Sequence, residues 1–429
     1  MTYESLIKTI SGGQLDDRFA LLYPGRTAEE SRARYLGAIE EFVQLYGKEG
    51  DISLFSVPGR SELSGNHTDH NHGRVIACSI DLDIIAVARP REDGVIRLKS
   101  AGFPEDVVDL AKFNAPREDR FGRSDALIAG VCAGFAATGH SIGGFDAYTT
   151  SNVLKGSGLS SSAAFEDMVG NILNHLYNGG RISYVEIARL SQFSENKYFG
   201  KPCGLMDQMA CAAGGIVSID FADPAAPVVR QVNVDFTAAG YCLCIVDTGG
   251  NHADLTADYA AVPAEMKAVA AHFGKSCLRE VDETEFAMAI PALRRECGDR
   301  AILRALHFFE ENRRVATQLD CLIKNDLPGY FEGVLASGRS SFCYLQNVYT
   351  NANVSEQGLS LALCLAENYL SKLDAPTAHR VHGGGFAGTI QAYVPRNSVA
   401  GFKALMDATF GDGACAVLHI RPEGAVKIA

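Results

Sequence analysis

Apolar and polar positions along this chain change pattern several times, without the regular succession of strands and helices that a parallel sheet requires. Residues 28–47 ("AEESRARYLGAIEEFVQLYG") predict a charged amphipathic helix, which leads into a first strand at residues 52–59 ("ISLFSVPG"). Residues 80–100 ("IDLDIIAVARPREDGVIRLKS") alternate and turn at Asp93-Gly94. Alternation on both sides of an Asp-Gly turn predicts a β-hairpin.

A second helix is predicted where a stretch rich in glycine and serine ends. Residues 151–179 ("SNVLKGSGLSSSAAFEDMVGNILNHLYNG") pass from loop-forming residues to apolar residues at helical spacing. A glycine- and serine-rich loop therefore feeds a helix N-terminus. The residues that share one face of this helix are Phe165, Met168, Val169, Ile172, Leu173 and Leu176.

The pattern changes again near residue 215. Strand-like runs ("GIVSIDF", "YCLCIVD") precede several helices, and two more strand-like runs ("GTIQAYVP", "CAVLHIRP") close the chain. Since no regular βαβ units appear, we predict an α+β fold with mixed or antiparallel sheets. We place the domains at residues 1–212 and 213–429, with the last strand able to pack back on the first domain.

Composition narrows the classes of function. The 429 residues carry a formal net charge of −12, which disfavours nucleic acid and anionic membranes as partners. No apolar run reaches the roughly 20 residues of a membrane helix, and the start lacks the pattern of a signal peptide. The twelve scattered cysteines predict reduced core residues. We therefore expect a cytoplasmic protein, a monomer or weak homo-oligomer, that acts on small molecules.

The stretch "KGSGLSSSAAFE" is a candidate phosphate site. Its glycines permit tight turns, and its serines lie where a helix presents unpaired N–H groups that favour an anion. The alternative is a serine run that merely caps the helix. The stretch matches neither a Walker loop nor a Rossmann fingerprint, so it indicates a different kind of nucleotide site.

Four motifs in order carry a family resemblance. "PGRSELSGNHTDHNHG", "KGSGLSSSAAFE", "FGKPCGLMDQMACAAGG" and "HGGGFAG" resemble the motifs of the GHMP small-molecule kinases, and look like the galactokinase branch. The resemblance implies a two-domain kinase that binds ATP and sugar in the cleft between its domains. It would transfer the γ-phosphoryl group of ATP to the anomeric hydroxyl of an aldose, with D-galactose as the first candidate.

The resemblance also implies residue roles around the nucleotide. Ser162 and Glu195 would contact Mg²⁺. The family usually has glycine where Ala387 stands, so Ala387 would be strained if that position required a positive φ. The residues that would bind the nucleotide are Gly156, Ser157, Gly158, Ser160, Ser161, Gly384 and Gly385.

Two residues would carry the chemistry. Phosphoryl transfer needs positioning and neutralisation of spread-out negative charge, which Arg60 would supply. The resemblance makes Asp207 the acceptor of the sugar hydroxyl's proton. Without the resemblance, Asp207 is an acidic residue in a first helical turn, which the helix dipole favours. Both Arg60 and the helix would lower the pKa of Asp207, making it ready to accept a proton but a weak base.

The histidine-rich loop would hold the sugar. By resemblance His67 and Asp69 are sugar contacts, together with Gly204 and with Tyr259 from the second half. His70 replaces a usual aromatic residue, and His72 has no assigned role. A zinc site formed by the three histidines is the alternative, although no HExxH or cysteine partner supports it.

The sugar loop departs from the family. Galactokinases normally have glutamate where Asn66 stands, and "GRVNLIG" where this chain has "GRSELSG". Asn66 is still a candidate sugar contact, since its amide accepts as well as donates. Galactose then remains a candidate, and a sugar with a C6 carboxylate such as galacturonate is the alternative, because Asn66 would not repel it.

Two other functions remain open from the sequence. One is a regulator that binds sugar and ATP without turnover, but the phosphate loop, Arg60 and Asp207 are all intact, which favours an enzyme. The other is a kinase for an isoprenoid alcohol, but "HTDHN" and "MDQM" resemble the sugar-specific members.

Overall fold

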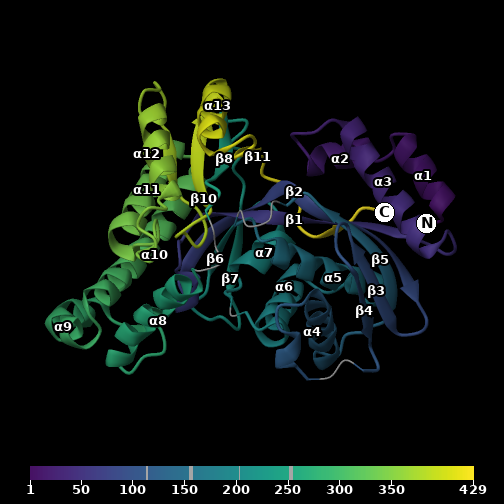
Figure 1. Ribbon diagram of the computed structural model, residues 1–429, viewed down its shortest axis with the longest axis horizontal. Coiled ribbons are helices and arrows are strands. Elements are labelled where there is room, and N and C mark those ends of the chain that lie inside the picture. Colours follow the sequence, from purple (N-terminus) through teal and green to yellow (C-terminus); the bar gives the residue numbers. More distant parts are fainter. Residues whose placement is uncertain (113–114, 154–157, 202, 251–254) are drawn as a thin grey trace.

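The computed structural model describes residues 1–112, 115–153, 158–201, 203–250 and 255–429, and within them the chain forms two sheets with helices packed on both (Figure 1). The larger sheet has eight strands and the smaller has four. Strands β3 to β5 of the larger sheet and helices α1 to α5 lie to the right in Figure 1, strands β6 and β7 lie near the centre, and helices α8 to α12 lie to the left. The fold is α+β, with mixed pairing in the larger sheet.

The larger sheet is built mainly from the first half of the chain. Its strands run in the order β12-β1-β2-β5-β3-β4, and β6 and β7 extend it from the other end of the long strand β2. The pairing of β3 with β5 is parallel, and the other pairings are antiparallel. The strands are β1 (Ser53–Ser64), β2 (Arg74–Arg91), β3 (Val95–Ser100), β4 (Glu105–Asp109), β5 (Gly144–Ser151), β6 (Ile216–Asp220), β7 (Val228–Val232) and β12 (Val426–Lys427).

The predicted hairpin around Asp93-Gly94 is wrong in its pairing. Strands β2 and β3 exist, but β5 lies between them, antiparallel to β2 and parallel to β3. Gly144 begins β5 directly against β3, where a Cβ would come within 2.6 Å of the backbone of Val95. The Asp93-Gly94 sequence therefore does mark a reversal of the chain. The close approach of Gly144 to β3 allows β5 to lie between β2 and β3.

Helices cover both faces of this sheet. Side chains of α1 to α3 pack on one face with Leu54 and Val87, and α4 and α5 pack on the other with Phe55 and Ala86. This double coverage explains why β1 is buried along its whole length rather than at alternate positions. The helices are α1 (Tyr3–Ser11), α2 (Asp16–Leu22), α3 (Ala28–Tyr46), α4 (Ser124–Ala137), α5 (Ser161–Tyr177), α6 (Tyr184–Ser194) and α7 (Met206–Ala213).

The smaller sheet belongs to the second half of the chain. Its order is β11-β8-β10-β9, all antiparallel, and α12 and α13 pack on one face. Helices α8 and α9 project away from it (Figure 1). The elements are β8 (Tyr241–Asp247), β9 (Ala378–Val381), β10 (Thr389–Pro395), β11 (Cys415–Leu418), α8 (Thr256–His272), α9 (Glu283–Glu296), α10 (Asp299–Ile323), α11 (Leu327–Ser340), α12 (Gly358–Leu370) and α13 (Val399–Phe410).

The change of sheet does not coincide with the sequence-based division at residue 213. Strands β6 and β7 still pair within the larger sheet, so the change falls between β7 and β8. At the other end of the chain, β12 returns to the larger sheet and pairs antiparallel with β1. Within the described residues, no helix is both long enough and apolar enough to cross a membrane.

Candidate active site

Arg60 and Asp207 meet where β1 approaches the N-termini of α5 and α7. Arg60 is buried near the end of β1, and its Nε donates to Asp207 Oδ1 at 2.7 Å. A second guanidinium nitrogen lies 2.6 Å from the same oxygen. Asp207 stands in the first turn of α7 with its side chain 31% exposed. The structure therefore brings the two candidate catalytic residues into one ion pair that keeps an open side.

The charge on Asp207 is stabilised by its partners. Burial acts to raise the pKa of Asp207, but the Arg60 guanidinium and the Ser160 hydroxyl, which donates to Oδ2, together hold the pKa below its usual value. The carboxylate is therefore ionised at neutral pH, and it accepts a proton only from a group that becomes strongly acidic as it reacts.

The N-terminus of α5 is left open by an unusual cap. Ser160 is the N-cap residue in a left-handed conformation with φ of 57°, and its hydroxyl is directed to Asp207 rather than to the helix N–H groups. The first turn, from Ser161, contains no acidic side chain. Because the described cap residue makes no side-chain hydrogen bond to the first turn, its N–H groups and the helix dipole form a binding place for an anion beside Asp207.

Ser162, in the first turn of α5, lies beside Glu195. The Ser162 hydroxyl donates to Glu195 Oε1 at 3.2 Å, and Glu195 begins a π-helical turn, η3 (Glu195–Phe199). Lys201 Nζ also donates to Glu195 Oε1 at 2.9 Å, and Gln208 Nε2 donates to Glu195 Oε2 at 2.8 Å. An oxygen cluster with one ammonium group already bound to it thus adjoins the open helix end.

A second glutamate lies behind this cluster. Glu166 is fully buried, and its Oε2 accepts from the same Gln208 amide at 3.1 Å. Burial, and then the nearby Glu195 carboxylate, raise the pKa of Glu166 well above its usual value. A buried carboxyl group thus lies directly behind the oxygen cluster and is linked to Glu195 through the Gln208 amide.

The histidine loop, residues 65–73, docks against the glycine turn, residues 382–388. His67 has a positive φ of 57°, and its Nε2–H donates to Gly384 O at 2.9 Å. Burial lowers the pKa of His67 to about 4, so the ring is neutral at pH 7. Tyr259, on α8, donates its hydroxyl to Gly385 O at 2.8 Å. The loop, the turn and α8 therefore bring these predicted residues to one place.

Asp69 lies directly against Gly204. A Cβ built on Gly204 would stand only 1.9 Å from Asp69 Oδ2, so only glycine fits there. Asp69 begins a short 3-10 helix, η1 (Asp69–Asn71), and its Oδ1 accepts the backbone N–H of His70 at 3.0 Å. Gly204 precedes α7, so Asp69 is held beside the element that carries Asp207.

The Asn66 side chain is completely buried and bonded within the protein. Its Nδ2 donates to Gly383 O at 2.6 Å and to Glu62 Oε1 at 3.2 Å. Its Oδ1 accepts from Asn347 Nδ2 at 2.8 Å and from the Ser341 hydroxyl at 3.3 Å. Asn66 thus joins the histidine loop to the glycine turn and to the segment after α11.

Two of the three histidines of the loop pack on each other, and the third has a different partner. His67 and His70 stack with their ring centres 6.2 Å apart, while His72 Nδ1 lies 3.4 Å from Cys277 Sγ. Within the part of the chain that the structure describes, no cluster of three metal-ligating side chains occurs. His72 therefore connects the loop to the segment after α8 through Cys277.

Ala387 does not carry the strain that the missing glycine suggested. The left-handed residue of the glycine turn that is not glycine is Phe386, with φ of 59°, and Ala387 is not among the described residues with positive φ. The Phe386 ring packs edge-on against Tyr259 at 5.4 Å. The aromatic contact and the bond from Tyr259 to Gly385 hold the turn in place.

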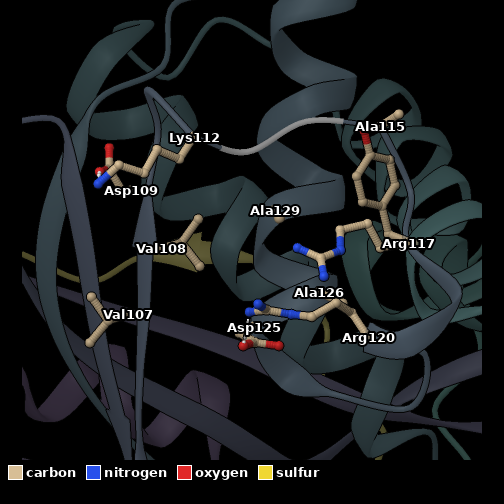
Figure 2. Close-up of a pocket in the computed structure, with 11 residues that line it drawn as sticks. Val107, Val108, Asp109, Lys112, Ala115, Arg117, Arg120, Asp125, Ala126 and Ala129 are labelled. Carbon is tan, nitrogen blue, oxygen red and sulfur yellow. Dashed lines mark hydrogen bonds and ion pairs between the residues drawn. The ribbon is translucent and has the colours of Figure 1, made fainter.

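A cavity of about 180 Å³ lies between β4 and α4 (Figure 2). Val108 and Ala129 border it, and the side chains of Arg117 and Arg120 extend along it. Tyr198 also lines the cavity, and it comes from the same π-helical turn as Glu195. One short element therefore connects this cavity with the oxygen cluster at α5.

Two of the predicted residues, Gly156 and Ser157, lie outside the described residues. Gly158, with φ of 69°, lies beside the ring of His382, and its carbonyl accepts from Arg60. Sequence reasoning missed Lys201 and Gln208, although both stand in the quoted motif that contains Asp207. It also missed that Asn66 is bonded within the protein, because three of its four partners come from distant segments.

Comparison with known protein families gives two matches. Residues 40–90 match the galactokinase galactose-binding signature, and residues 126–215 match the N-terminal domain of GHMP kinases. The galactokinase of Streptomyces coelicolor is 33% identical over 374 residues, which cover 86% of this chain and 91% of that protein. The galactokinase of Glaesserella parasuis is 30% identical over 379 residues, covering 85% and 91% respectively.

Solved structures agree with this similarity. Lactococcus lactis galactokinase complexed with galactose superposes with a TM-score of 0.76 at 25% identity, covering 91% of this chain and 99% of that one. A mevalonate kinase superposes with a TM-score of 0.59 at 14% identity, over 86% and 98%. The second likeness concerns the fold alone.

Proposed function

Because this chain belongs to the galactokinase family, we propose that it transfers the γ-phosphoryl group of ATP to the anomeric hydroxyl of D-galactose, giving α-D-galactose 1-phosphate. One observation carries the proposal: Asp207, ionised and paired with Arg60, lies between an open helix N-terminus and the Asp69–Gly204 contact of the histidine loop. A phosphate bound at the helix N-terminus and a sugar bound at the histidine loop would meet at Asp207.

In this proposal each residue has a defined task. The N–H groups of α5 hold the phosphate oxygens, and Arg60 neutralises the charge that spreads over the transferred group. Asp207 orients the sugar hydroxyl and accepts its proton as the new O–P bond forms. Since its pKa is lowered, the proton transfers late, when the hydroxyl oxygen is already bonded to phosphorus.

The oxygen cluster fits a divalent cation. The Ser162 hydroxyl and the Glu195 carboxylate are hard oxygen donors, and the ammonium group of Lys201 at Glu195 shows that this oxygen attracts a positive charge. Ser162 and Glu195 would hold Mg²⁺ together with oxygens of the nucleotide. When bound, Mg²⁺ supplies neutralisation of the phosphate charge.

The cavity between β4 and α4 is the candidate place for the nucleoside. It offers apolar walls from Val108 and Ala129 and the aromatic ring of Tyr198, which suit a flat base. Its connection to Glu195 through η3 supports a nucleotide whose phosphates extend to α5.

The surroundings of Asn66 favour a neutral sugar. Both amide hydrogens are bonded to protein acceptors, so Asn66 offers no free donor to a C6 carboxylate. The neutral state of His67 likewise provides no cation for such a group. These observations favour galactose over galacturonate, and the intact pair of Arg60 and Asp207 favours catalysis over sensing.

The test is ADP release with MgATP and a panel of galactose, galacturonate, N-acetylgalactosamine, glucose and arabinose, with the phosphate position in the product determined by NMR. We expect the highest kcat/KM with galactose and phosphate on the anomeric oxygen. Turnover of galacturonate alone would overturn the choice of sugar. Binding of ATP and galactose with no ADP release would overturn the proposed catalysis.

A further inference from the structure

Asn66 has a fixed orientation because of what surrounds it. Its Nδ2 faces two acceptors, the Glu62 carboxylate and the Gly383 carbonyl, while its Oδ1 faces two donors, from Asn347 and Ser341. An amide has two N–H donors and two acceptor positions, so all four are in use. If the amide were rotated by half a turn, its oxygen would face the acceptor oxygens of Glu62 and Gly383.

Glu62 is the charged partner in this arrangement. It lies on β1 with its side chain 4% exposed, and its Oε1 accepts from the fully buried Arg380 as well as from Asn66. Arg380 lies 4.0 Å from a second buried carboxylate, Glu311, whose Oε1 accepts the backbone N–H of Gly65 at 3.2 Å. The charge of Glu62 is thus neutralised, and the same network reaches the backbone just before Asn66.

Glu62 and Asn66 are close in the chain as well as in space. Glu62 lies near the end of β1, and Asn66 lies four residues later in the loop that follows. The direct bond between the two side chains couples them, with the Asn66 amide as donor and the Glu62 carboxylate as acceptor.

We propose that Glu62 and Asn66 form a coupled acid–amide pair, in which Glu62 is a positioning residue that orients the histidine loop for the sugar. The inference rests on the proposed sugar kinase activity. Asn66 precedes His67, whose positive φ and bond to Gly384 depend on where the loop is clamped. The pair therefore acts on the sugar through the loop, without contacting the transferred phosphoryl group.

Single exchanges break the balance of charges and hydrogen bonds. Asn66→Glu places a second carboxylate against Glu62 and the Gly383 carbonyl, which repels unless a proton is taken up. Glu62→Asn leaves the buried Arg380 without its closest carboxylate. The double exchange, Glu62→Asn with Asn66→Glu, restores one carboxylate, one amide and the net charge.

The test is a double-mutant cycle of these variants, with KM for galactose, KM for MgATP, kcat and the free energy of unfolding measured for each. The matched control is Glu92→Asn, at an exposed position between β2 and β3. We expect each single exchange to raise KM for galactose at least about tenfold, with KM for MgATP within about threefold of wild type. We expect the double exchange to return KM for galactose to within about threefold of wild type.

The proposal would be overturned if the effects of the two single exchanges on KM for galactose were additive in the double exchange. It would also be overturned if KM for galactose and KM for MgATP rose equally. If an exchanged variant does not fold, Glu62→Gln decides, since its amide oxygen still accepts from Asn66. We expect the rise in KM for galactose, expressed as a free energy, to be smaller than the loss in the free energy of unfolding. A larger effect on KM than on unfolding counts against the proposal. Wild-type enzyme that does not turn over galactose refutes the proposed function instead, and the unfolding cycle then tests the pair by itself.

Discussion

At the scale of single residues, Gly204 leaves room for the Asp69 carboxylate. We expect Gly204→Ala to displace Asp69 and to raise KM for galactose at least about tenfold, because the added Cβ would lie 1.9 Å from Asp69 Oδ2. Steady-state kinetics with both substrates varied measure this effect, and KM for MgATP serves as the internal reference.

The matched control for this change is Gly37→Ala. Gly37 lies in the middle of α3, and a Cβ there meets nothing within 4 Å, so we expect unchanged kinetics and slightly greater stability. If Gly204→Ala behaved like Gly37→Ala, the Asp69 carboxylate would not be needed at its observed position.

The sequence predicts the role of a residue best where the residues that act with it are close to it in the chain. The motif around Asp207 and the loop with His67 and Asp69 were recognisable, since their residues are adjacent in the chain. The diversion of the Ser160 hydroxyl from its helix to Asp207 was not, because a serine at that position ordinarily caps the helix. Three of the four bonds that saturate Asn66 come from distant parts of the chain.

At the scale of elements, α4 forms one wall of the cavity shown in Figure 2. We expect Ala129→Phe to fill part of this cavity and to raise KM for MgATP at least about tenfold, while KM for galactose changes little. Nucleotide titration calorimetry and steady-state kinetics measure the two effects. An unaltered affinity for nucleotide would place the nucleoside elsewhere.

The elements themselves were predictable where local patterning decided them. Helix α3 begins one residue after Thr27, whose hydroxyl and Glu30 form a capping box, and the amphipathic pattern agreed with it. The pairing of β2 with β3 failed, because strand order depends on packing between distant segments such as Gly144 and Val95. Strands β6 and β7 likewise join the larger sheet through pairing with β2, which local patterning does not indicate.

At the scale of the whole molecule, Asp83 connects three distant parts. It accepts from Arg34 on α3, from Tyr23 at 2.6 Å and from Arg421 in the C-terminal segment at 3.2 Å. We expect Asp83→Asn to lower the free energy of unfolding by about 3–5 kcal/mol, because it leaves two arginines without their carboxylate. Urea denaturation measures the loss.

Asp412→Asn is the control for that change, since Asp412 is exposed in the turn between α13 and β11. A loss for Asp83→Asn no larger than that of the control would contradict a role of Asp83 in holding α3 and the C-terminal segment on the sheet.

Stability should also depend on pH through buried histidines. Burial lowers the pKa of several histidines below that of the unfolded chain, so their contribution is complete above about pH 6.5 and is lost as pH falls below it. For His67, with a pKa of about 4, the loss reaches about 2 kcal/mol at pH 5. The histidines with lowered pKa are His67, His175, His307, His379 and His382.

His419 has the opposite effect on the pH dependence of stability, because Asp81 raises its pKa. The five histidines with lowered pKa outweigh this single group. We therefore expect the unfolding temperature to fall between pH 7 and pH 5 when measured by calorimetry at constant ionic strength. An unfolding temperature that rose over this range would contradict the neutral state of these rings.

The central claim is that Asp207 receives the proton of the sugar hydroxyl beside an intact nucleotide site. The most direct measurement compares wild type with Asp207→Asn in kcat for galactose phosphorylation and in Kd for MgATP. We expect kcat to fall at least about a hundredfold, with Kd for MgATP within about threefold of wild type, because the amide cannot accept the proton. Retention of most of the turnover by Asp207→Asn would contradict the claim.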